Sequence, residues 1–237
     1  MDNFGYKVEL FLKDFIDAGG YRKVIAGLGN TLSIAVVGLI IGILIGTIIA
    51  AVRVFPKYKL MPRILNGICS LYVEFFRGTP MVVQLLLSYY VLLPLLGVRG
   101  ADSVVVAMVV FGLNSGAYIS EIMRGGILSV DPGQMEGGRA MGLSFGTTMM
   151  KIVIPQAIKN ILPTLGNEFI TLIKETSIVS FIAALDLYKA FNDIGTNNYE
   201  FIVPYLVMAV IYILLVLIIS IGVRLMERSL RKGDRSM

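Results

Sequence analysis

Three long apolar stretches stand out along the chain. Residues 28–52 and 201–223 carry no charge, and residues 101–123 hold one interior acid, Glu121. A helix needs about 20 apolar residues to cross the hydrocarbon core of a bilayer. Each stretch is long enough, so the pattern predicts three membrane-spanning helices.

Two further apolar stretches are less regular. Residues 80–97 are apolar but short, so their helix is expected to begin a few residues earlier. Residues 155–185 are interrupted by a proline and four polar or charged side chains: Pro163, Asn167, Glu168, Lys174 and Glu175. With these two stretches, the sequence predicts an all-α membrane protein with about five transmembrane helices.

The first 27 residues are predicted to form a separate interfacial segment. Apolar side chains of residues 4–18 fall on one helical face: Phe4, Val8, Phe11, Leu12 and Phe15. This pattern is typical of an amphipathic helix on a membrane surface. The acids and the short apolar run do not fit a secretory signal peptide. Gly19-Gly20 is expected to end this helix.

Basic residues predict which ends of the spans face the cytoplasm, because cytoplasmic loops carry an excess of Lys and Arg. The cations are Arg53, Lys57, Lys59 and Arg63 in the first loop, Arg124, Arg139 and Lys151 around the third, and Arg224, Arg228, Arg231, Lys232 and Arg235 in the tail. The opposite side holds mixed or acidic segments: Arg99, Asp102, Asp186, Lys189, Asp193 and Glu200. We therefore expect an outer N-terminus, a transmembrane domain over 28–228 and a basic cytoplasmic tail over 229–237.

Glycines recur every fourth residue in the first span, at Gly38, Gly42 and Gly46. Small residues at this spacing let another helix approach closely. We interpret them as a packing face, although glycine is common in membrane helices generally.

Composition supports a membrane protein and excludes several kinds of site. Of the 237 residues, 56% are hydrophobic and 16% charged, against about 25% charged in a typical soluble domain. The single Cys69 gives no disulfide framework, and the absence of His removes His-ligated metals and a Ser-His relay. The net charge of +5 is explained by basic cytoplasmic loops rather than by nucleic-acid binding.

The stretch from Asp131 to Pro155 is the most informative segment. Asp131-Pro132-Gly133 is a helix-start signal, since Asp caps helices and Pro favours the first helical position. Glu136 is then near a helix N-terminus, where the helix dipole favours an acid. Gly142 is expected to end this short helix or to permit close contact with a partner. A short helix between two membrane helices can transmit movement from a soluble partner.

This segment resembles the EAA loop of ABC importer permeases. That pattern has Glu-Ala-Ala, three residues, Gly, nine residues and Ile-x-Leu-Pro, and here Glu136, Gly142 and Ile152–Pro155 stand at the matching spacing. Gly137-Gly138 replace the two alanines, and Ile154 replaces Leu. The resemblance implies the type I importer permease fold and docking of an ATPase by these residues: Glu136, Gly137, Gly138, Arg139, Ala140, Met141, Gly142, Leu143 and Phe145.

Further stretches resemble the polar amino acid (His/Glu/Gln/Arg/opine) permease subfamily, so that the likeness covers nearly the whole chain. They are the motif Glu74, Arg77, Gly78, Thr79 and Pro80, the stretches 112–126 and 166–177, and the closing residues 227–231. The resemblance implies import of polar amino acids by alternating access, across a bacterial cytoplasmic membrane that the chain crosses several times. It also implies three kinds of partner: a second permease, two ATPase subunits and an external amino acid-binding protein.

The sequence agrees with this division of labour. It has no G-x-x-x-x-G-K-[ST] phosphate loop, so ATP and Mg are expected on the partner ATPase and no cofactor on this chain. The chain is therefore predicted not to be an enzyme by itself. Whether the second permease is a copy or a relative stays open.

Polar side chains within the spans are candidates for the substrate pathway, because such groups usually face a cavity or each other. They lie at helical spacing on three spans: Gln84 and Ser88; Asn114, Ser115, Tyr118 and Glu121; Asn167, Glu168 and Thr171. Acids could hold an ammonium group, while amides and hydroxyls could hold a carboxylate.

An alternative is that these groups fix helix packing or pair with Arg77, Lys159 or Lys174. Glu121 is close to Arg124, and Glu74 is expected to pair with Arg77. The amino acid itself stays open, with only a weak preference for a cationic one.

Two other functional classes fit less well. A secondary transporter would leave the 136–155 loop unexplained, and no internal repeat is visible. An intramembrane serine enzyme at Ser115 would lack the usual His base.

Overall fold

The computed structural model describes residues 4–55, 58 and 60–232, and these residues contain helices and no strand. The long helices are α2 (Gly20–Val54), α3 (Leu60–Gly78), α6 (Ser103–Leu128), α9 (Ile154–Glu175) and α11 (Ile202–Lys232). The short ones are α1 (Phe4–Leu12), α4 (Met81–Leu87), α5 (Leu93–Leu95), α7 (Pro132–Ala140), α8 (Phe145–Thr148) and α10 (Leu187–Asn198). The prediction of an all-α protein is confirmed.

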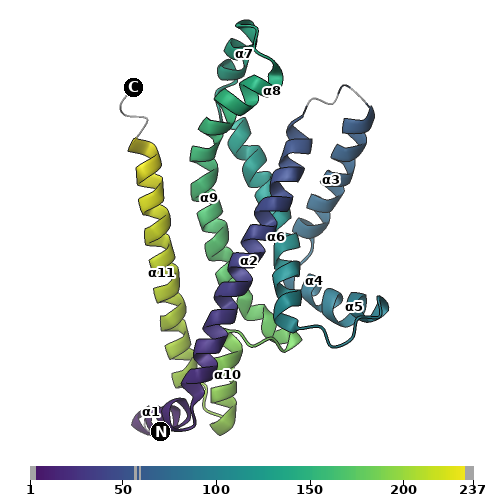
Figure 1. Ribbon diagram of the computed structural model, residues 1–237. Coiled ribbons are helices and arrows are strands. Elements are labelled where there is room, and N and C mark those ends of the chain that lie inside the picture. The colour runs from purple at the N-terminus through teal and green to yellow at the C-terminus, as the bar shows by residue number, and fades with distance from the viewer. Residues whose placement is uncertain (1–3, 56–57, 59, 233–237) are drawn as a thin grey trace.

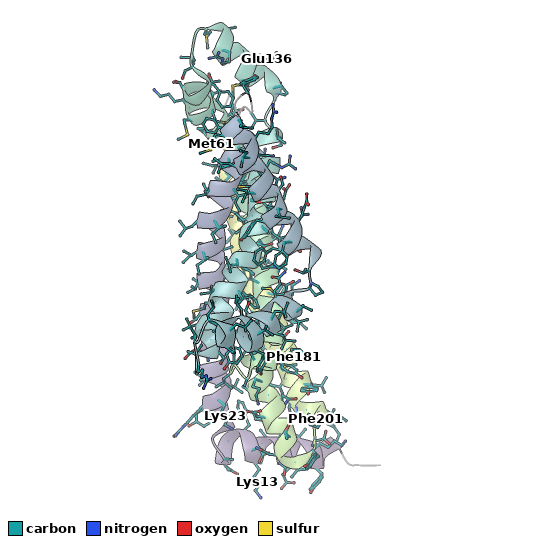
Figure 2. All side chains as sticks on the ribbon, turned by 90° about the vertical axis from the view of Figure 1, so that its right-hand side faces the viewer. Lys13, Lys23, Met61, Glu136, Phe181 and Phe201 are labelled. Atoms are coloured by element: carbon teal, nitrogen blue, oxygen red, sulfur yellow. The ribbon has the colours of Figure 1, made fainter. Side chains whose placement is uncertain are left out.

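The long helices run lengthwise through an elongated molecule (Figure 1). The C-terminal end of α2, the start of α3, the α7–α8 segment and the C-terminal end of α11 lie at one end, and α1 and α10 lie at the other. Figure 2 shows the same division, with Met61 and Glu136 at one end and Lys13, Lys23 and Phe201 at the opposite end. The predicted basic segments thus share one end of the bundle, although Lys57, Lys59 and Arg235 lie outside the described residues.

Within the described part of the chain, α2, α6 and α11 are each long and apolar enough to cross a membrane. The pair formed by α3 and residues 81–95 would supply a fourth crossing if it is counted as one broken span. Helix α9 carries the polar interruptions seen in the sequence and includes Pro163 in its interior. It ends at Glu175, where a 3₁₀ segment (Thr176–Ile182) begins.

Residues 81–95 form one continuous helical segment, but the prediction that this helix begins a few residues before Pro80 is wrong. The chain bends by 104° between α3 and α4, then continues through a π-helical turn (Ser88–Leu92) into α5. The physical cause is Pro80, which has extended backbone angles of φ −63° and ψ 138° and disfavours helical geometry in the residue before it. The apolar segment after Pro80 is therefore a separate arm of a bent pair with α3, and not an extension of one straight helix.

Helices α2 and α6 pack along the glycine stripe predicted from the sequence. A Cβ atom added at Gly38 would lie 3.1 Å from Phe111. The same addition at Gly42 would meet Ser115, and at Gly46 would meet Ile119, each at 2.8 Å. The packing-face interpretation is confirmed, and the main apolar core forms beside this contact, around Ile34, Leu85, Phe111, Leu172 and Ile173.

The N-terminal helix α1 is attached to the rest of the chain. Val8, Phe11 and Phe15 of the predicted apolar face pack against α10 and α11, whereas Phe4 and Leu12 are exposed. Lys7 forms an ion pair of 3.0 Å with Glu200. Gly19 adopts φ +73°, so the chain turns there and α2 begins at Gly20, eight residues before the predicted span.

Two hydrogen bonds attach the start of α10 to α2. The backbone N–H of Leu187 donates to the Thr31 hydroxyl at 3.1 Å, and the Asn30 amide donates to the Leu185 carbonyl at 2.8 Å. Asp186 is fully buried and caps α10 by accepting from the backbone N–H of Lys189 at 2.8 Å. Burial raises the pKa of Asp186 to about 6.

Candidate functional site

The short helix α7 begins where its sequence predicts. The Asp131 carboxylate accepts a hydrogen bond of 2.8 Å from the backbone N–H of Gly133, and Pro132 occupies the first turn. Such a cap satisfies a donor that the helix leaves unpaired. Because these interactions are local, the sequence was sufficient to place this end.

The same helix ends at Gly142, as expected. Gly142 adopts φ +85°, and its backbone N–H donates to the Arg139 carbonyl at 3.0 Å. The N–H of Leu143 donates to the Gly138 carbonyl at 3.1 Å, which completes a Schellman motif. The Arg139 guanidinium also donates to the Leu143 carbonyl at 2.8 Å, so the turn after α7 is held from both sides.

The two glycines that replace Ala-Ala have different surroundings. A Cβ atom added at Gly137 would meet nothing within 4 Å. One added at Gly138 would lie 2.5 Å from Thr148 Cγ2 and 3.3 Å from Ile152 Cδ1. Thr148 is fully buried, and its hydroxyl donates to the Ser144 carbonyl at 3.0 Å. Gly138 therefore permits close contact between α7 and the helix that follows it.

Helix α8 leads into α9 without a break. A π-helical turn (Met149–Val153) joins them directly before Pro155, whose missing N–H and bulky ring are compatible with such local widening. Val130, Val153 and Ala157 form a buried cluster beneath this junction. Packed contacts therefore connect the α7 segment to the start of α9.

The outer surface of this segment is accessible. Glu136, Gly137, Arg139, Ala140 and Gly142 are exposed, and the Met141 side chain is 75% exposed. Leu143 is half-buried, as is Phe145, whose ring lies edge-on to Phe55 with centroids 5.9 Å apart. Apart from the buried Gly138, the predicted docking residues therefore contribute to one projecting surface at the end of the bundle, seen around Glu136 in Figure 2.

Two predicted pathway residues, Gln84 and Asn114, support the bend after α3. The Gln84 amide donates to the carbonyls of Phe76 at 2.9 Å and Thr79 at 3.0 Å, and it accepts from the Asn114 amide at 2.9 Å. Both amides are buried. These contacts satisfy carbonyls left unpaired at the end of α3, which is a structural use of the two side chains.

Ser115 and Glu168 come together between α6 and α9. The fully buried Ser115 hydroxyl donates to Glu168 Oε1 at 3.0 Å. Glu168 itself is half-buried. On the same helix Asn167 is exposed, and Thr171 is half-buried and donates to the Asn167 carbonyl at 3.1 Å. In this group of predicted polar residues, the Glu168 carboxylate is only partly buried and is accessible from outside the core.

The other predicted residues lie apart from that group. Tyr118 is exposed, and the Arg77 guanidinium lies 5.5 Å from its ring centroid. The predicted ion pair of Arg77 with Glu74 is absent among the described residues, where both side chains are exposed. Ser88 is half-buried at the start of the π-helical turn before α5.

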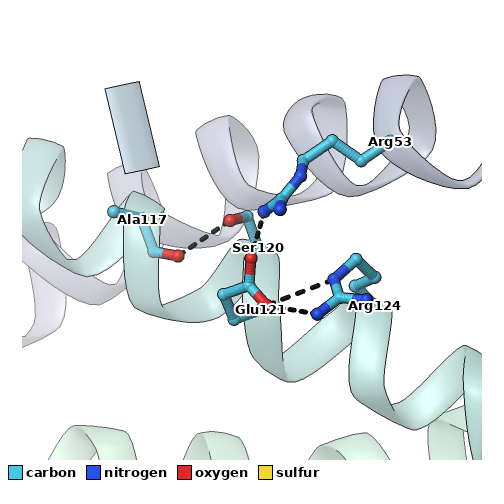
Figure 3. A network of polar contacts seen from close by, with 5 residues as sticks. All are labelled: Arg53, Ala117, Ser120, Glu121 and Arg124. Atoms are coloured by element: carbon cyan, nitrogen blue, oxygen red, sulfur yellow. Dashed lines mark hydrogen bonds and ion pairs between the residues drawn. The ribbon is translucent and has the colours of Figure 1, made fainter. Parts of the chain in front are cut away.

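Glu121 is occupied by two cations, which weakens its candidacy for substrate binding (Figure 3). Arg53 at the end of α2 donates to Oε1, and Arg124 donates to Oε2 at 2.8 and 3.1 Å. The pairing with Arg124 was foreseen from their spacing on one helix. Arg53 is 68 positions away, so its part was not visible before the packing of α2 on α6 was known.

Comparisons with known proteins agree with these features. The sequence profile of the family described as binding-protein-dependent transport system inner membrane component matches residues 38–232. The arginine transport system permease protein ArtQ of Bacillus subtilis (strain 168) is 38% identical over 211 residues, covering 89% of this chain and 94% of the relative. The glutamine transport system permease protein GlnP of Escherichia coli (strain K12) is 35% identical over 208 residues, covering 88% and 93%.

Solved structures are also similar. A crystal structure of an amino acid ABC transporter with histidines has a chain that is 39% identical, with a TM-score of 0.82 over 91% of this chain and 98% of that one. An inward-facing structure of the MetNI methionine ABC transporter is 20% identical with a TM-score of 0.73, over 88% and 96% of the two chains, and shows likeness of fold alone.

Proposed function

This chain belongs to the family of binding-protein-dependent transport system inner membrane components, and we propose that α7 and α8 are the point at which a separate ATPase drives it. It is the membrane-spanning permease subunit of an ATP-binding cassette importer of amino acids. The ATPase activity is on another subunit. Its polar amino acid substrate is of the kind named for the arginine and glutamine permeases, so arginine and glutamine are the first to test.

The observation that carries the coupling role is the projecting position of α7, which is capped at both ends. Its exposed face from Glu136 to Gly142 offers a docking surface, and its opposite face is fixed against Thr148 by Gly138. Helix α8, which follows α7 after a short turn, is continuous through the π turn into α9. When nucleotide closes the ATPase pair, α7 moves with it, and α9 changes its position relative to α6. The permease pair then changes the side to which its cavity opens, which is alternating access.

A charge reversal tests the docking surface. Glu136→Lys in the permease, reconstituted with its ATPase and binding protein, is expected to lower ATPase co-purification and to abolish ATP-dependent uptake. Glu9→Lys is the matched control, because Glu9 is an exposed acid in α1 at the opposite end. Retained uptake and co-purification with Glu136→Lys would remove α7 from the coupling role.

Glu168 is our candidate for contact with the amino acid. Its carboxylate is half-buried, and Ser115 donates to one of its oxygens, whereas both oxygens of Glu121 are held by arginines. A partly desolvated carboxylate suits an ammonium or guanidinium group. Asn167 and Thr171 extend the same polar face. We expect Glu168→Gln to lower uptake with little effect on ATPase docking, and unchanged uptake would contradict this role.

The complete importer on this proposal has two ATPase subunits that bind ATP and Mg, a second permease and an external amino acid-binding protein. The end that carries α7 faces the cytoplasm of a bacterial cell and α1 lies outside, in agreement with the distribution of Arg and Lys. Labelled arginine uptake into vesicles with and without internal ATP tests the class. Competition by unlabelled histidine, glutamine, glutamate and cystine then ranks the substrates.

A further inference from the structure

An apolar groove of about 460 Å³ lies between α2, α6, α8 and α9 on the α7 side of the bundle. Its wall includes Ala51 and Phe55 of α2, Met123 of α6, and Phe145 and Leu165 on either side of the π turn. We propose that this groove binds one acyl chain of an anionic phospholipid whose headgroup rests on the neighbouring basic residues. The proposal does not depend on which amino acid is transported.

The lining chemistry favours a hydrocarbon chain. Thr47 is the one lining residue with a polar side-chain group, and its hydroxyl already donates to the Ile43 carbonyl at 2.6 Å. An amino acid substrate would find no partner there for its charges, which would be costly to bury. Apolar cavities of about 150 Å³ stay dry and accept benzene. This groove is about three times larger, which suits a longer apolar chain.

The groove also runs in the direction of the lipid chains. On α2 it extends from Thr47 to Phe55, and on α9 from Ile154 to Leu165. At 1.5 Å per residue these stretches correspond to about 12 and 16 Å along the helix axes. An acyl chain lying parallel to the membrane-spanning helices would therefore follow the groove from its headgroup end toward the bilayer interior.

Positive charge borders the end of the groove near α7. Arg53 directly precedes a lining residue of α2, Arg124 directly follows Met123, and Lys151 directly follows Met150. Arg53, Glu121 and Arg124 form one cluster with two cations and one anion, which leaves it net positive. The Arg124 side chain is 37% exposed, and Lys151 is exposed. A phosphate is the complement of this rim, as in other basic pockets at the cytoplasmic ends of membrane helices.

A second copy of the chain is a less suitable occupant. A two-fold interface brings the same surface of both copies together, so with its axis near the end of the groove the cationic rims would face each other. Like charges at that distance oppose association. An anionic lipid instead neutralises the rim and fills the groove at once.

Lipid titration of the purified full-length chain, followed by native mass spectrometry, tests the proposal. The probes are phosphatidylglycerol and phosphatidylcholine with identical acyl chains. Wild type is expected to retain one phosphatidylglycerol per chain. Ala51→Phe fills the groove from an exposed position and should lower this binding at least tenfold, while Ala26→Phe, on an exposed position of α2 outside the groove, should leave it unchanged. Lys151→Gln should lower phosphatidylglycerol binding about fivefold without changing phosphatidylcholine binding.

Equal lipid retention by wild type and Ala51→Phe would overturn the proposal. If Ala51→Phe does not fold, Gly146→Val gives the same test, because a Cβ at this lining residue meets nothing within 4 Å. Oxidative cross-linking in native membranes, with Ala51→Cys in a Cys69→Ser background, examines the other occupant. A disulfide-linked dimer would place a second copy in the groove and would also overturn the proposal.

Discussion

Replacing Gly137 and Gly138 separately by alanine should have opposite effects on α7. Alanine is favoured over glycine inside a helix by roughly 0.5–1 kcal/mol. At Gly137 a new Cβ meets nothing within 4 Å, so Gly137→Ala should stabilise α7 by about that amount. At Gly138 the Cβ would lie 2.5 Å from a methyl group of Thr148, which is fully buried and cannot turn into solvent.

Overpacking of this kind costs about 1–3 kcal/mol. After the gain in helix propensity is subtracted, Gly138→Ala should destabilise the segment by about 0.5–2 kcal/mol. Thr148→Ser removes the methyl group in question and keeps the hydroxyl that bonds to the Ser144 carbonyl. The double variant Gly138→Ala/Thr148→Ser should therefore recover most of the loss.

Hydrogen exchange of the α7 amides, measured by mass spectrometry on the purified chain, reports the local stability directly. Since about 1.4 kcal/mol corresponds to a factor of ten, Gly137→Ala should slow exchange roughly two- to fivefold. Gly138→Ala should speed it by a factor of about 2–30. Equal effects of the two substitutions, or no recovery in the double variant, would refute the reasoning that Gly138 is required by close packing.

Three other perturbations give distinct outcomes. Glu121→Gln leaves Arg53 without its partner in a partly buried site and should lower the thermal midpoint of the detergent-solubilised chain; an unchanged midpoint would show the pair to be energetically neutral. Gln84→Ala removes the side-chain donor to the Thr79 carbonyl and the shorter of two side-chain hydrogen bonds to the Phe76 carbonyl, at a cost of about 1–3 kcal/mol measured by denaturant unfolding, and a cost near zero would contradict that role. The pKa of Asp186 is about 6 when folded and about 3.9 when unfolded, so its contribution to stability is present below pH 4 and is lost as pH rises through 6. The melting temperature should therefore fall over this pH range, and Asp186→Asn should remove that dependence.

The sequence predicted best what is determined locally. The start of α7 depends on Asp131 and Pro132, and its end depends on Gly142, all within the helix or two residues of it. The long apolar stretches are equally local, since their length and composition alone mark α2, α6 and α11. Such features can be predicted without knowledge of tertiary contacts.

Other features depended on contacts between distant segments. Gln84 and Asn114 looked like part of a substrate pathway because polar groups in spans usually face a cavity, but the 104° bend brings unpaired carbonyls of α3 to them instead. The partner of Glu121 on α2 could not be identified from helical spacing. A turn at Pro80 was readable in principle, because proline restricts the residue before it, but the short length of the apolar stretch 80–97 favoured a helix that begins earlier.

The glycines of α2 that face α6 limit how these two helices can move relative to each other. Phe111, Ser115 and Ile119 each lie opposite a glycine, and sliding one helix past the other by a fraction of a turn would bring these side chains against the larger residues between the glycines. The two helices are thus expected to move as one rigid body, with little movement relative to each other. Any rearrangement that moves a solute across the bilayer is then expected to change the contact between α9 and the α2–α6 pair. Distance probes are best attached on either side of that contact.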